Sequence, residues 1–344
     1  MTEVHVVLPN DIDDPATPSG GNAYDRQVCR GLAAAGWRLR EHAVPGAWPR
    51  PSAAECTNLA RVLDRLPDGA VVLLDGLVAS AVPDVLVPEA RRLRLVVLVH
   101  LPTEDAAEGA ALAAARAVIA TSAWTRRRLL DRYRLPADRV HVATPGVDAA
   151  PLVPGSDAGS RLLCVAAVTP PKGHDVLADA LAKVADLTWD CGCVGALNRD
   201  PGFVERLRGR LDGYDLAGRV RLVGPRTGHA LDAAYAAADL LVLASRGETY
   251  GMVVTEALAR GIPVLATAAN GLPEALGRAP DGSLPGLLVQ PEDPAAVADA
   301  LRRWLTEPEL RRRLRRSARA RRATLAGWAV TSGRIAGTLR EAAA

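Results

Sequence analysis

The segment Asp239–Ala266 constrains the fold of this chain more than any other stretch. Two apolar runs, Asp239–Ala244 and Ile262–Ala266, have the length and composition of buried strands. Apolar residues recur between them at helical spacing: Val253, Val254, Ala257 and Leu258. The spacing predicts a helix that begins near Gly251. Strand, loop, helix and strand in this order predict a parallel βαβ unit, and therefore an α/β fold.

The polar residues of this segment gather near the start of the predicted helix. Glu248 lies in the loop before the helix, and Glu256 lies within about two turns of its start. The backbone N–H groups of Tyr250, Gly251 and Met252 are free there, and the helix dipole favours an anion such as a phosphate. Two carboxylates beside a phosphate fit a sugar nucleotide, whose sugar and ribose hydroxyls would donate to them. Ordinary surface acids on a solvent-facing loop are the alternative.

The residues from Ser245 to Glu274 resemble the donor-site signature of the family 4 retaining glycosyltransferases of the GT-B fold. An E-x7-E pattern runs into E-A-L-A-R-G-I-P-V-L-A-T, and G-L-P-E follows. The resemblance implies that Glu248 contacts the donor sugar and Glu256 the ribose. It also implies that the backbone of Tyr250, Gly251 and Met252 binds the diphosphate. The likeness covers most of the chain and is strongest over residues 160–290.

Composition is consistent with two domains of ordinary size. The chain has 344 residues, of which 49% are apolar, enough to fill two cores. The formal net charge is only +3, which does not indicate a nucleic-acid-binding protein. The five cysteines lack metal-ligand spacing, and Cys191 and Cys193 are expected to be small core residues of a strand. No signal pattern and no apolar run of about 20 residues is present, so we expect a cytoplasmic protein.

A second nest of backbone N–H groups is predicted near the N-terminus. A strand over Val4–Leu8 precedes Gly20-Gly21 and a helix over Ala23–Ala35. Because the glycines stand at the carboxyl end of a strand, they favour a ligand there. By resemblance, Gly20, Gly21 and Asn22 bind the acceptor, whereas Tyr24 and Asp25 have no firm equivalent.

Three acids in the same loop, Asp11, Asp13 and Asp14, raise the question of a metal. A D-x-D pattern binds a divalent ion in GT-A transferases, but GT-B members generally need none. We therefore expect neither a metal nor a cofactor, the nucleotide sugar being a co-substrate. A solvated acidic loop and a loop that meets a cationic acceptor group are the two alternatives.

Two further polar residues stand at the ends of predicted strands. Asp75 follows the strand Val71–Leu74, and His100 follows Leu95–Val99. Open α/β sheets place ligands at such strand ends. The resemblance implies that His100 lines the pocket for the acceptor and the donor sugar. Asp75 is a weaker acceptor-side candidate, because family members carry different residues there.

The second half supplies the cation for the diphosphate. Lys172-Gly173 follows Pro170-Pro171, which we expect to preclude helix at that point. By resemblance, Lys172 neutralises the leaving diphosphate. The family usually has an arginine five residues earlier, where this chain has Ala167. Arg246 or Arg226 is a candidate replacement.

The loop Val223–Thr227 is, by resemblance, where the nucleobase is read, largely through backbone groups. Gly224 and Arg226 in this loop are therefore candidate donor-binding residues. The base itself is not specified by these residues, and a UDP- or GDP-linked sugar is expected.

These features predict two Rossmann-like domains that face a central cleft. The N-terminal, acceptor-binding domain is expected over 1–150 and the nucleotide-sugar-binding domain over 151–325. A C-terminal helix over 326–344 is expected to cross back to the first domain. The basic stretch 309–322 has three interpretations: a solvated helix face, contact with an anionic membrane, or contact with a partner.

The predicted activity is transfer of a sugar from a nucleotide sugar to an acceptor hydroxyl with retained configuration. A small soluble acceptor is favoured. The alternatives are a phosphorylase or pseudo-glycosyltransferase of the same fold, or an impaired sugar-nucleotide-binding regulatory protein, which the absent arginine at Ala167 would explain.

Overall fold

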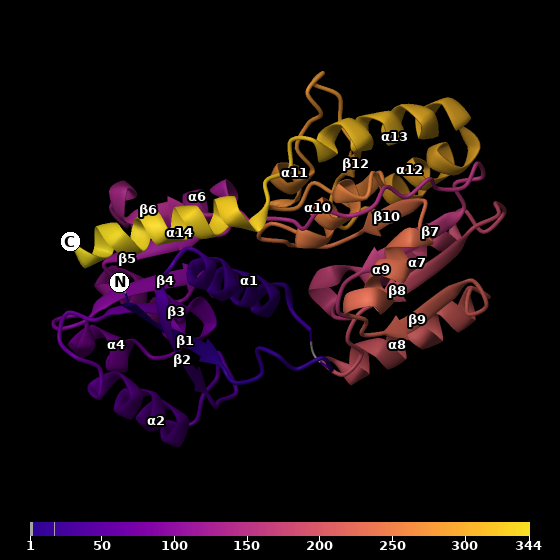
Figure 1. Ribbon diagram of the computed structural model, residues 1–344. Helices are drawn as coiled ribbons and strands as arrows, with labels where there is room; N and C mark the ends of the chain where they lie inside the picture. The colour runs from indigo at the N-terminus through magenta and orange to yellow at the C-terminus, as the bar shows by residue number, and fades with distance from the viewer. Residues whose placement is uncertain (1–2, 17) are drawn as a thin grey trace. The chain divides into compact units, whose positions relative to one another are not determined.

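The computed structural model describes residues 3–16 and 18–344, and these form two compact units (Figure 1). Unit 1 comprises 1–13, 20–146 and 326–344, and unit 2 comprises 14–19 and 147–325. Each unit contains one parallel sheet of six strands. The chain therefore has the α/β class that the alternating pattern predicts.

Unit 1 holds its sheet in the order β2-β1-β3-β4-β5-β6. Its strands are β1 (Glu3–Pro9), β2 (Arg38–Val44), β3 (Val71–Asp75), β4 (Arg94–Val99), β5 (Ala117–Ala120) and β6 (Val140–Val142). Its helices are α1 (Gly20–Ala34), α2 (Ala53–Asp64), α3 (Gly76–Ser80), α4 (Pro83–Glu89), α5 (Ala106–Ala114), α6 (Ala123–Tyr133), the 3₁₀ turn η1 (Ala137–Arg139) and α14 (Trp328–Ala343). The central strands β3 and β5 are buried along their whole length, as continuous apolar runs require when helices cover both sheet faces.

Unit 2 holds its sheet in the order β12-β11-β10-β7-β8-β9. Its strands are β7 (Arg161–Val165), β8 (Asp190–Val194), β9 (Val220–Gly224), β10 (Leu240–Leu243), β11 (Val264–Thr267) and β12 (Gly286–Val289). Its helices are the 3₁₀ turn η2 (Pro170–Lys172), α7 (His174–Ala182), α8 (Pro201–Gly213), α9 (Gly228–Ala236), α10 (Met252–Ala259), α11 (Leu272–Leu276), α12 (Pro294–Thr306) and α13 (Pro308–Arg322). The predicted βαβ unit is β10-α10-β11. As expected, Cys191 and Cys193 are buried in β8.

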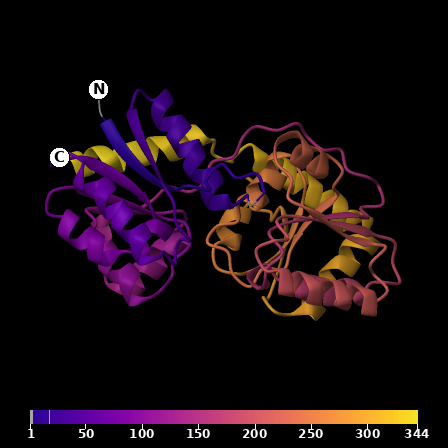
Figure 2. The ribbon, with the colours of Figure 1, turned by 90° about the horizontal axis from the view of Figure 1, so that it is seen from below.

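The last helix, α14, belongs to unit 1 and packs against α1 (Figures 1 and 2). Trp328, at its start, meets the edge of the Tyr24 ring, with 5.5 Å between ring centroids. A Cβ built on Gly146 would lie 2.4 Å from the backbone nitrogen of Trp328, so the chain passes close to itself here. The Thr331 hydroxyl donates to the carbonyl of Thr144 at 2.8 Å. Residues far apart in the sequence thus share one core.

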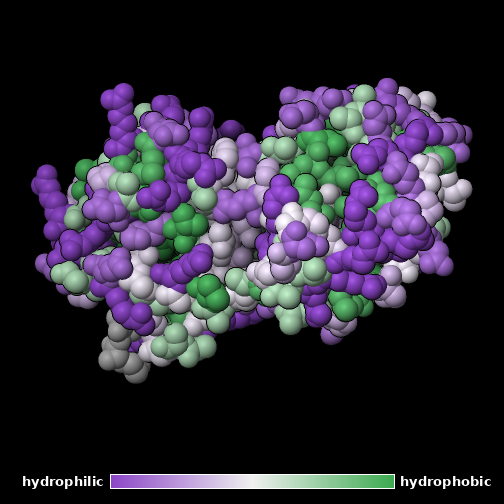
Figure 3. All heavy atoms as spheres, turned by 90° about the horizontal axis from the view of Figure 1, so that it is seen from above, coloured by the Kyte–Doolittle hydropathy of each residue, from purple (hydrophilic) through white to green (hydrophobic). Residues whose placement is uncertain are grey.

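Some of the arginines of the basic helix α13 form hydrogen bonds within unit 2. Arg311 is buried and donates to the Trp304 carbonyl at 2.8 Å, while Arg315 donates to the Ser156 carbonyl at 2.6 Å. The remaining basic face is exposed at Arg312, Arg313, Arg316 and Arg319. Figure 3 looks from the side where Figure 1 places α13, and hydrophilic side chains cover much of unit 2 there around a hydrophobic patch. In the part of the chain that is described, no helix has the length and apolar character needed to span a membrane.

Candidate functional site

Lys172 and Glu248 follow neighbouring strands of the unit 2 sheet. Lys172 ends η2, just after β7, and Glu248 lies in the loop after β10; these two strands pair in parallel. From β7 the chain builds one half of the sheet through β8 and β9, whereas β10 to β12 build the other half. The strand order reverses between β7 and β10, and open α/β sheets bind their ligands at such a switch point.

The two side chains meet at this point. The Lys172 ammonium lies 2.7 Å from Oε1 of Glu248, and the Ser245 hydroxyl donates to the same oxygen at 3.1 Å. Both charged side chains are partly exposed, with 30% exposure for Lys172 and 13% for Glu248. The pair is therefore reachable by a ligand yet sheltered enough for its charges to matter.

Gly173 allows the chain to reach this arrangement. Its φ of +65° lies in the left-handed region, and a Cβ built on it would lie 1.9 Å from the carbonyl oxygen of Ala244. Pro170 and Pro171 do not preclude helix, contrary to expectation, because they form η2 with Lys172. Prolines fit the first positions of a helical turn, where the missing N–H has no partner to lose.

Helix α10 begins at Met252, with Gly251 as its N-cap at a φ of +95°. No side chain caps this end, so its N–H groups point outward unbound by a capping oxygen. Burial raises the pKa of Tyr250 to about 12, which keeps its phenol neutral near pH 7. The N-terminus of α10 thus has the geometry of an anion site beside Lys172 and Glu248.

Glu256 lies in the second turn of α10 and is partly buried. The Tyr235 hydroxyl donates to its Oε2 at 2.7 Å. Burial raises the pKa of Glu256, although the Tyr235 bond and the Arg260 charge oppose the rise. A carboxylate held in this way is an acceptor ready for a hydroxyl donor.

Of the two candidate replacements for the missing arginine at Ala167, Arg246 is occupied. Its guanidinium forms a bidentate pair with Asp175, both distances being 2.9 Å, and a third bond to Glu292 at 3.0 Å. Arg226 is exposed in the loop after β9, next to Gly224, whose φ is +79°. Arg246 therefore organises the loop around Lys172 and has no free charge to offer a ligand.

The residues of unit 1 predicted to bind the acceptor also stand at a switch point, between β1 and β3. Helix α1 begins at Gly20, three residues before the predicted start, so Gly20 and Gly21 form its first turn. Gly21 lies next to His100: a Cβ built on Gly21 would lie 3.4 Å from the His100 ring, an ordinary van der Waals distance. Asn22 reaches back with Nδ2 to the Asp11 carbonyl at 3.2 Å.

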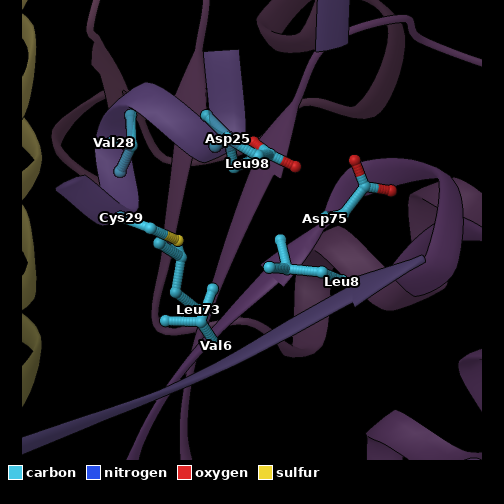
Figure 4. Close-up of a pocket in the computed structure, with 8 residues that line it drawn as sticks. All are labelled: Val6, Leu8, Asp25, Val28, Cys29, Leu73, Asp75 and Leu98. Atoms are coloured by element: carbon cyan, nitrogen blue, oxygen red, sulfur yellow. The ribbon is translucent and has the colours of Figure 1, made fainter. Parts of the chain in front are cut away.

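A buried cluster joins three residues of unit 1: Asp25 from α1, Asp75 at the end of β3, and His100 after β4. His100 Nε2 lies 2.7 Å from Asp25 Oδ1 and 3.7 Å from Asp75 Oδ2. Asp75 Oδ1 also caps α3 by accepting from two backbone N–H groups. Figure 4 shows the two carboxylates facing each other at the end of a small cavity whose other labelled residues are apolar or Cys29.

Proximity and burial change the protonation of this cluster. Burial, with the Asp25 carboxylate adding to it, raises the pKa of Asp75 to about 7. For His100, burial disfavours the charged ring, but the Asp25 carboxylate outweighs it and the pKa is raised. Near neutral pH, the cluster therefore holds protons that the unfolded chain would release.

This shift predicts a pH dependence of stability. Between about pH 4 and pH 7 the folded protein binds a proton on Asp75 that the unfolded chain has lost, so stability falls as pH rises, by on the order of 1.4 kcal/mol per unit. The raised pKa of His100 acts in the same direction at higher pH. We therefore expect the unfolding midpoint of Asp75→Asn, measured at pH 5, 6, 7 and 8, to rise relative to that of the parent as pH increases. A difference that stays constant across this range would contradict the assignment.

The acids of the β1–α1 loop do not form a comparable group. Asp13 makes a bidentate pair with Arg26 at 2.9 and 2.7 Å, and Arg26 also binds Glu41. Across residues 3–16 and 18–344, the one trio of potential metal-ligating side chains within reach of one another is Asp25, Asp75 and His100.

Comparison with known families follows this division into two units. Residues 156–321 match the family model described as "Glycosyl transferases group 1", and residues 3–150 match "Glycosyltransferase Family 4". The chain belongs to family 4 of the glycosyltransferases. The resemblance seen around Glu248 and Glu256 is thereby confirmed at the level of the family, and the roles of individual residues stay predictions.

Curated relatives agree with this family 4 assignment, and solved structures agree with the fold. The D-inositol 3-phosphate glycosyltransferase of Frankia alni is 35% identical over 252 residues, 67% of this chain and 60% of the relative. The chain thus spans about three fifths of that relative's length. Sucrose-phosphate synthase from Thermosynechococcus elongatus has a TM-score of 0.78 at 22% identity, covering 99% of each chain. Anabaena HepE in complex with UDP-glucose has a TM-score of 0.79 at 17% identity, covering 99% of this chain and 100% of that one. The fold is GT-B, as predicted.

Asp25 is the residue of this candidate site that sequence reasoning left without a role. It lies 75 residues from His100, and neither motif predicts their contact. The available signal was a charged residue at a position of α1 that the apolar pattern places inward, with Val28, Cys29 and Leu32.

Proposed function

We propose that the chain transfers a sugar from a nucleoside-diphosphate sugar to the hydroxyl of a small acceptor, with retention at the anomeric carbon. The observation that carries the proposal is the Lys172–Glu248 pair beside the uncapped start of α10, at the switch point of the unit 2 sheet. A cation and free N–H groups suit a diphosphate, and a partly exposed carboxylate suits sugar hydroxyls.

In this proposal each residue has a separate task. The N–H groups at Tyr250, Gly251 and Met252 bind the diphosphate, and Lys172 stabilises the charge that grows on it as the bond to the sugar breaks. Glu256 accepts from the ribose. Glu248, already held by Lys172 and Ser245, accepts from the sugar rather than attacking the anomeric carbon.

The acceptor hydroxyl would then attack from the side of the leaving group. Its oxygen forms the new bond to the anomeric carbon while the phosphate oxygen departs and takes up the hydroxyl proton. Gly20, Gly21, Asn22 and His100 of unit 1 would bind the acceptor. No metal ion is needed in this scheme, because Lys172 and the α10 terminus supply the positive charge.

Uridine is the base we favour, since one structural neighbour, Anabaena HepE, forms a complex with UDP-glucose. Folded protein that binds a nucleotide gains about 2.7 kcal/mol at a ligand concentration 100 times the Kd. We expect UDP to raise the unfolding midpoint equally with and without magnesium, and more than GDP, ADP or TDP. A chain that none of them stabilises would refute the donor site.

Product from a UDP-sugar, examined by NMR, should keep the donor's anomeric configuration.

A second candidate is a protein that binds a sugar nucleotide without transferring the sugar. The observation that favours it is the engagement of Arg246 by Asp175 and Glu292, which leaves the missing arginine at Ala167 without a replacement from that side chain. UDP binding without hydrolysis or transfer of the donor sugar would favour this candidate. Restored turnover in Ala167→Arg would identify the missing charge as its cause.

A further inference from the structure

The Asp25–Asp75–His100 cluster has more negative than positive charge available to it. Asp25 is 3% exposed and Asp75 is 5% exposed, so water compensates neither well. Oδ2 of Asp25 is buried and has no hydrogen-bond partner. A buried carboxylate oxygen in this state is unfavourable unless a donor reaches it.

The neighbouring basic residues do not supply that donor. Arg26, next along α1, is held by Asp13 and Glu41. The Tyr24 hydroxyl donates to the Ala143 carbonyl. His100 donates to Oδ1 of Asp25, and its distance of 3.7 Å to Oδ2 of Asp75 is too long for a hydrogen bond. Within the described ranges, the contacts of the cluster thus leave Oδ2 of Asp25 and Oδ2 of Asp75 without a hydrogen-bond donor, and Figure 4 shows the two side chains near each other.

We propose that this cluster receives an ammonium group of the acceptor, which is therefore an amino sugar or an aminocyclitol. The inference rests on the proposed function and names its acceptor class. An ammonium group has three N–H donors and is about the size of a water molecule. One N–H can therefore donate to Asp25 Oδ2 and a second to Asp75 Oδ2. The cluster lies beside Gly21, since a Cβ built on Gly21 would lie 3.4 Å from the His100 ring.

A phosphorylated acceptor fits this site poorly. The relative from Frankia alni is named for inositol 3-phosphate, which is anionic. Two buried carboxylates with one imidazole would repel such a group, since like charges in a poorly solvated site interact strongly. Burial first and the Asp25 carboxylate second raise the pKa of Asp75, and a cation beside the two acids would oppose both effects.

A divalent metal ion is the other cation that these atoms could hold. The three potential ligand atoms lie within 4.8 Å of one another. A metal would have to replace the 2.7 Å bond between His100 and Asp25, whereas an ammonium leaves that bond in place and uses the two free oxygens. The geometry therefore favours the ammonium, and the metal becomes an outcome to test.

The test compares ligands that differ in one group. Titration calorimetry on the full chain, saturated with UDP, would use myo-inositol, an inosamine and myo-inositol 3-phosphate, and in parallel glucose, glucosamine and glucose 6-phosphate. Charge-assisted hydrogen bonds predict that in at least one set the amine binds about 10-fold or more tightly than the matched alcohol. Asp25→Asn and Asp75→Asn should each abolish that preference. Asp64→Asn, at an exposed acid that ends α2, should keep it.

The same samples separate the ways in which the idea can fail. If UDP binds but no amine is preferred, or the phosphate binds at least as well, the acceptor class is wrong and the donor site stands. If Mn²⁺ binds one to one and is lost in Asp25→Asn, the cluster is a metal site instead. If UDP itself does not bind, the proposed function fails. Circular dichroism of each variant establishes that a lost preference is not lost folding.

Discussion

Replacing Lys172 with methionine is expected to lower the rate of sugar transfer by about 10²- to 10³-fold, the range found when one charge-stabilising group is removed from an active site. Methionine keeps much of the side-chain length and removes the charge that lies 2.7 Å from Glu248. The loss should appear in kcat, because the charge on the diphosphate grows as the bond breaks. Steady-state kinetics with a UDP-sugar would measure it.

The chain offers a matched control for this substitution. Lys183 is the only other lysine, and it is exposed at the end of α7. Lys183→Met changes the net charge by the same amount and should leave the rate within about twofold. Equal losses in both variants, or none in either, would remove Lys172 from the mechanism.

Glu248→Ala should abolish turnover without unfolding the protein.

The second large effect is expected from Gly173→Ala. The new Cβ would lie 1.9 Å from the Ala244 carbonyl oxygen, and the residue would have to keep a φ of +65°. Backbone strain and overpacking together predict destabilisation of about 3 kcal/mol, and the loop that carries Lys172 must shift. Thermal unfolding and UDP binding should both be impaired.

Gly218→Ala provides the comparison for Gly173→Ala. Gly218 is exposed, and a Cβ built on it would have no heavy atom within 4 Å. This variant should unfold at nearly the parent temperature and bind UDP normally. If Gly173→Ala behaves in the same way, the close approach of the two loops is not required.

The donor half of the site was predictable because its residues are close in sequence. Glu248, the start of α10 and Glu256 fall within nine consecutive residues, so one motif and the helical period place them. The parallel sheets follow from continuous apolar runs separated by helices. Strand order does not follow from these patterns, and it is the order that puts Lys172 next to Glu248.

The acceptor half depends on contacts that no local pattern contains. The bond between Asp25 and His100 requires α1 to lie beside the end of β4, which depends on tertiary structure. The early start of α1 was missed because glycine has low helix propensity, yet Gly20 and Gly21 form the first turn of the helix. Likewise, the sequence does not show that Arg246 is paired, whereas in the structure Asp175 and Glu292 bind its guanidinium.

The placement of α14 in unit 1 has a consequence for how the protein is made. A ribosome that has produced residues 1–146 has synthesised every strand of the first sheet, yet the face of α1 that contacts α14 has no cover until residues 326–344 emerge. Apart from the short segment 14–19, unit 2 consists of residues 147–325, which can fold in the meantime. Tyr24 adjoins Asp25 and packs against Trp328, so the acceptor-side cluster gains its final support only at the last stage of synthesis.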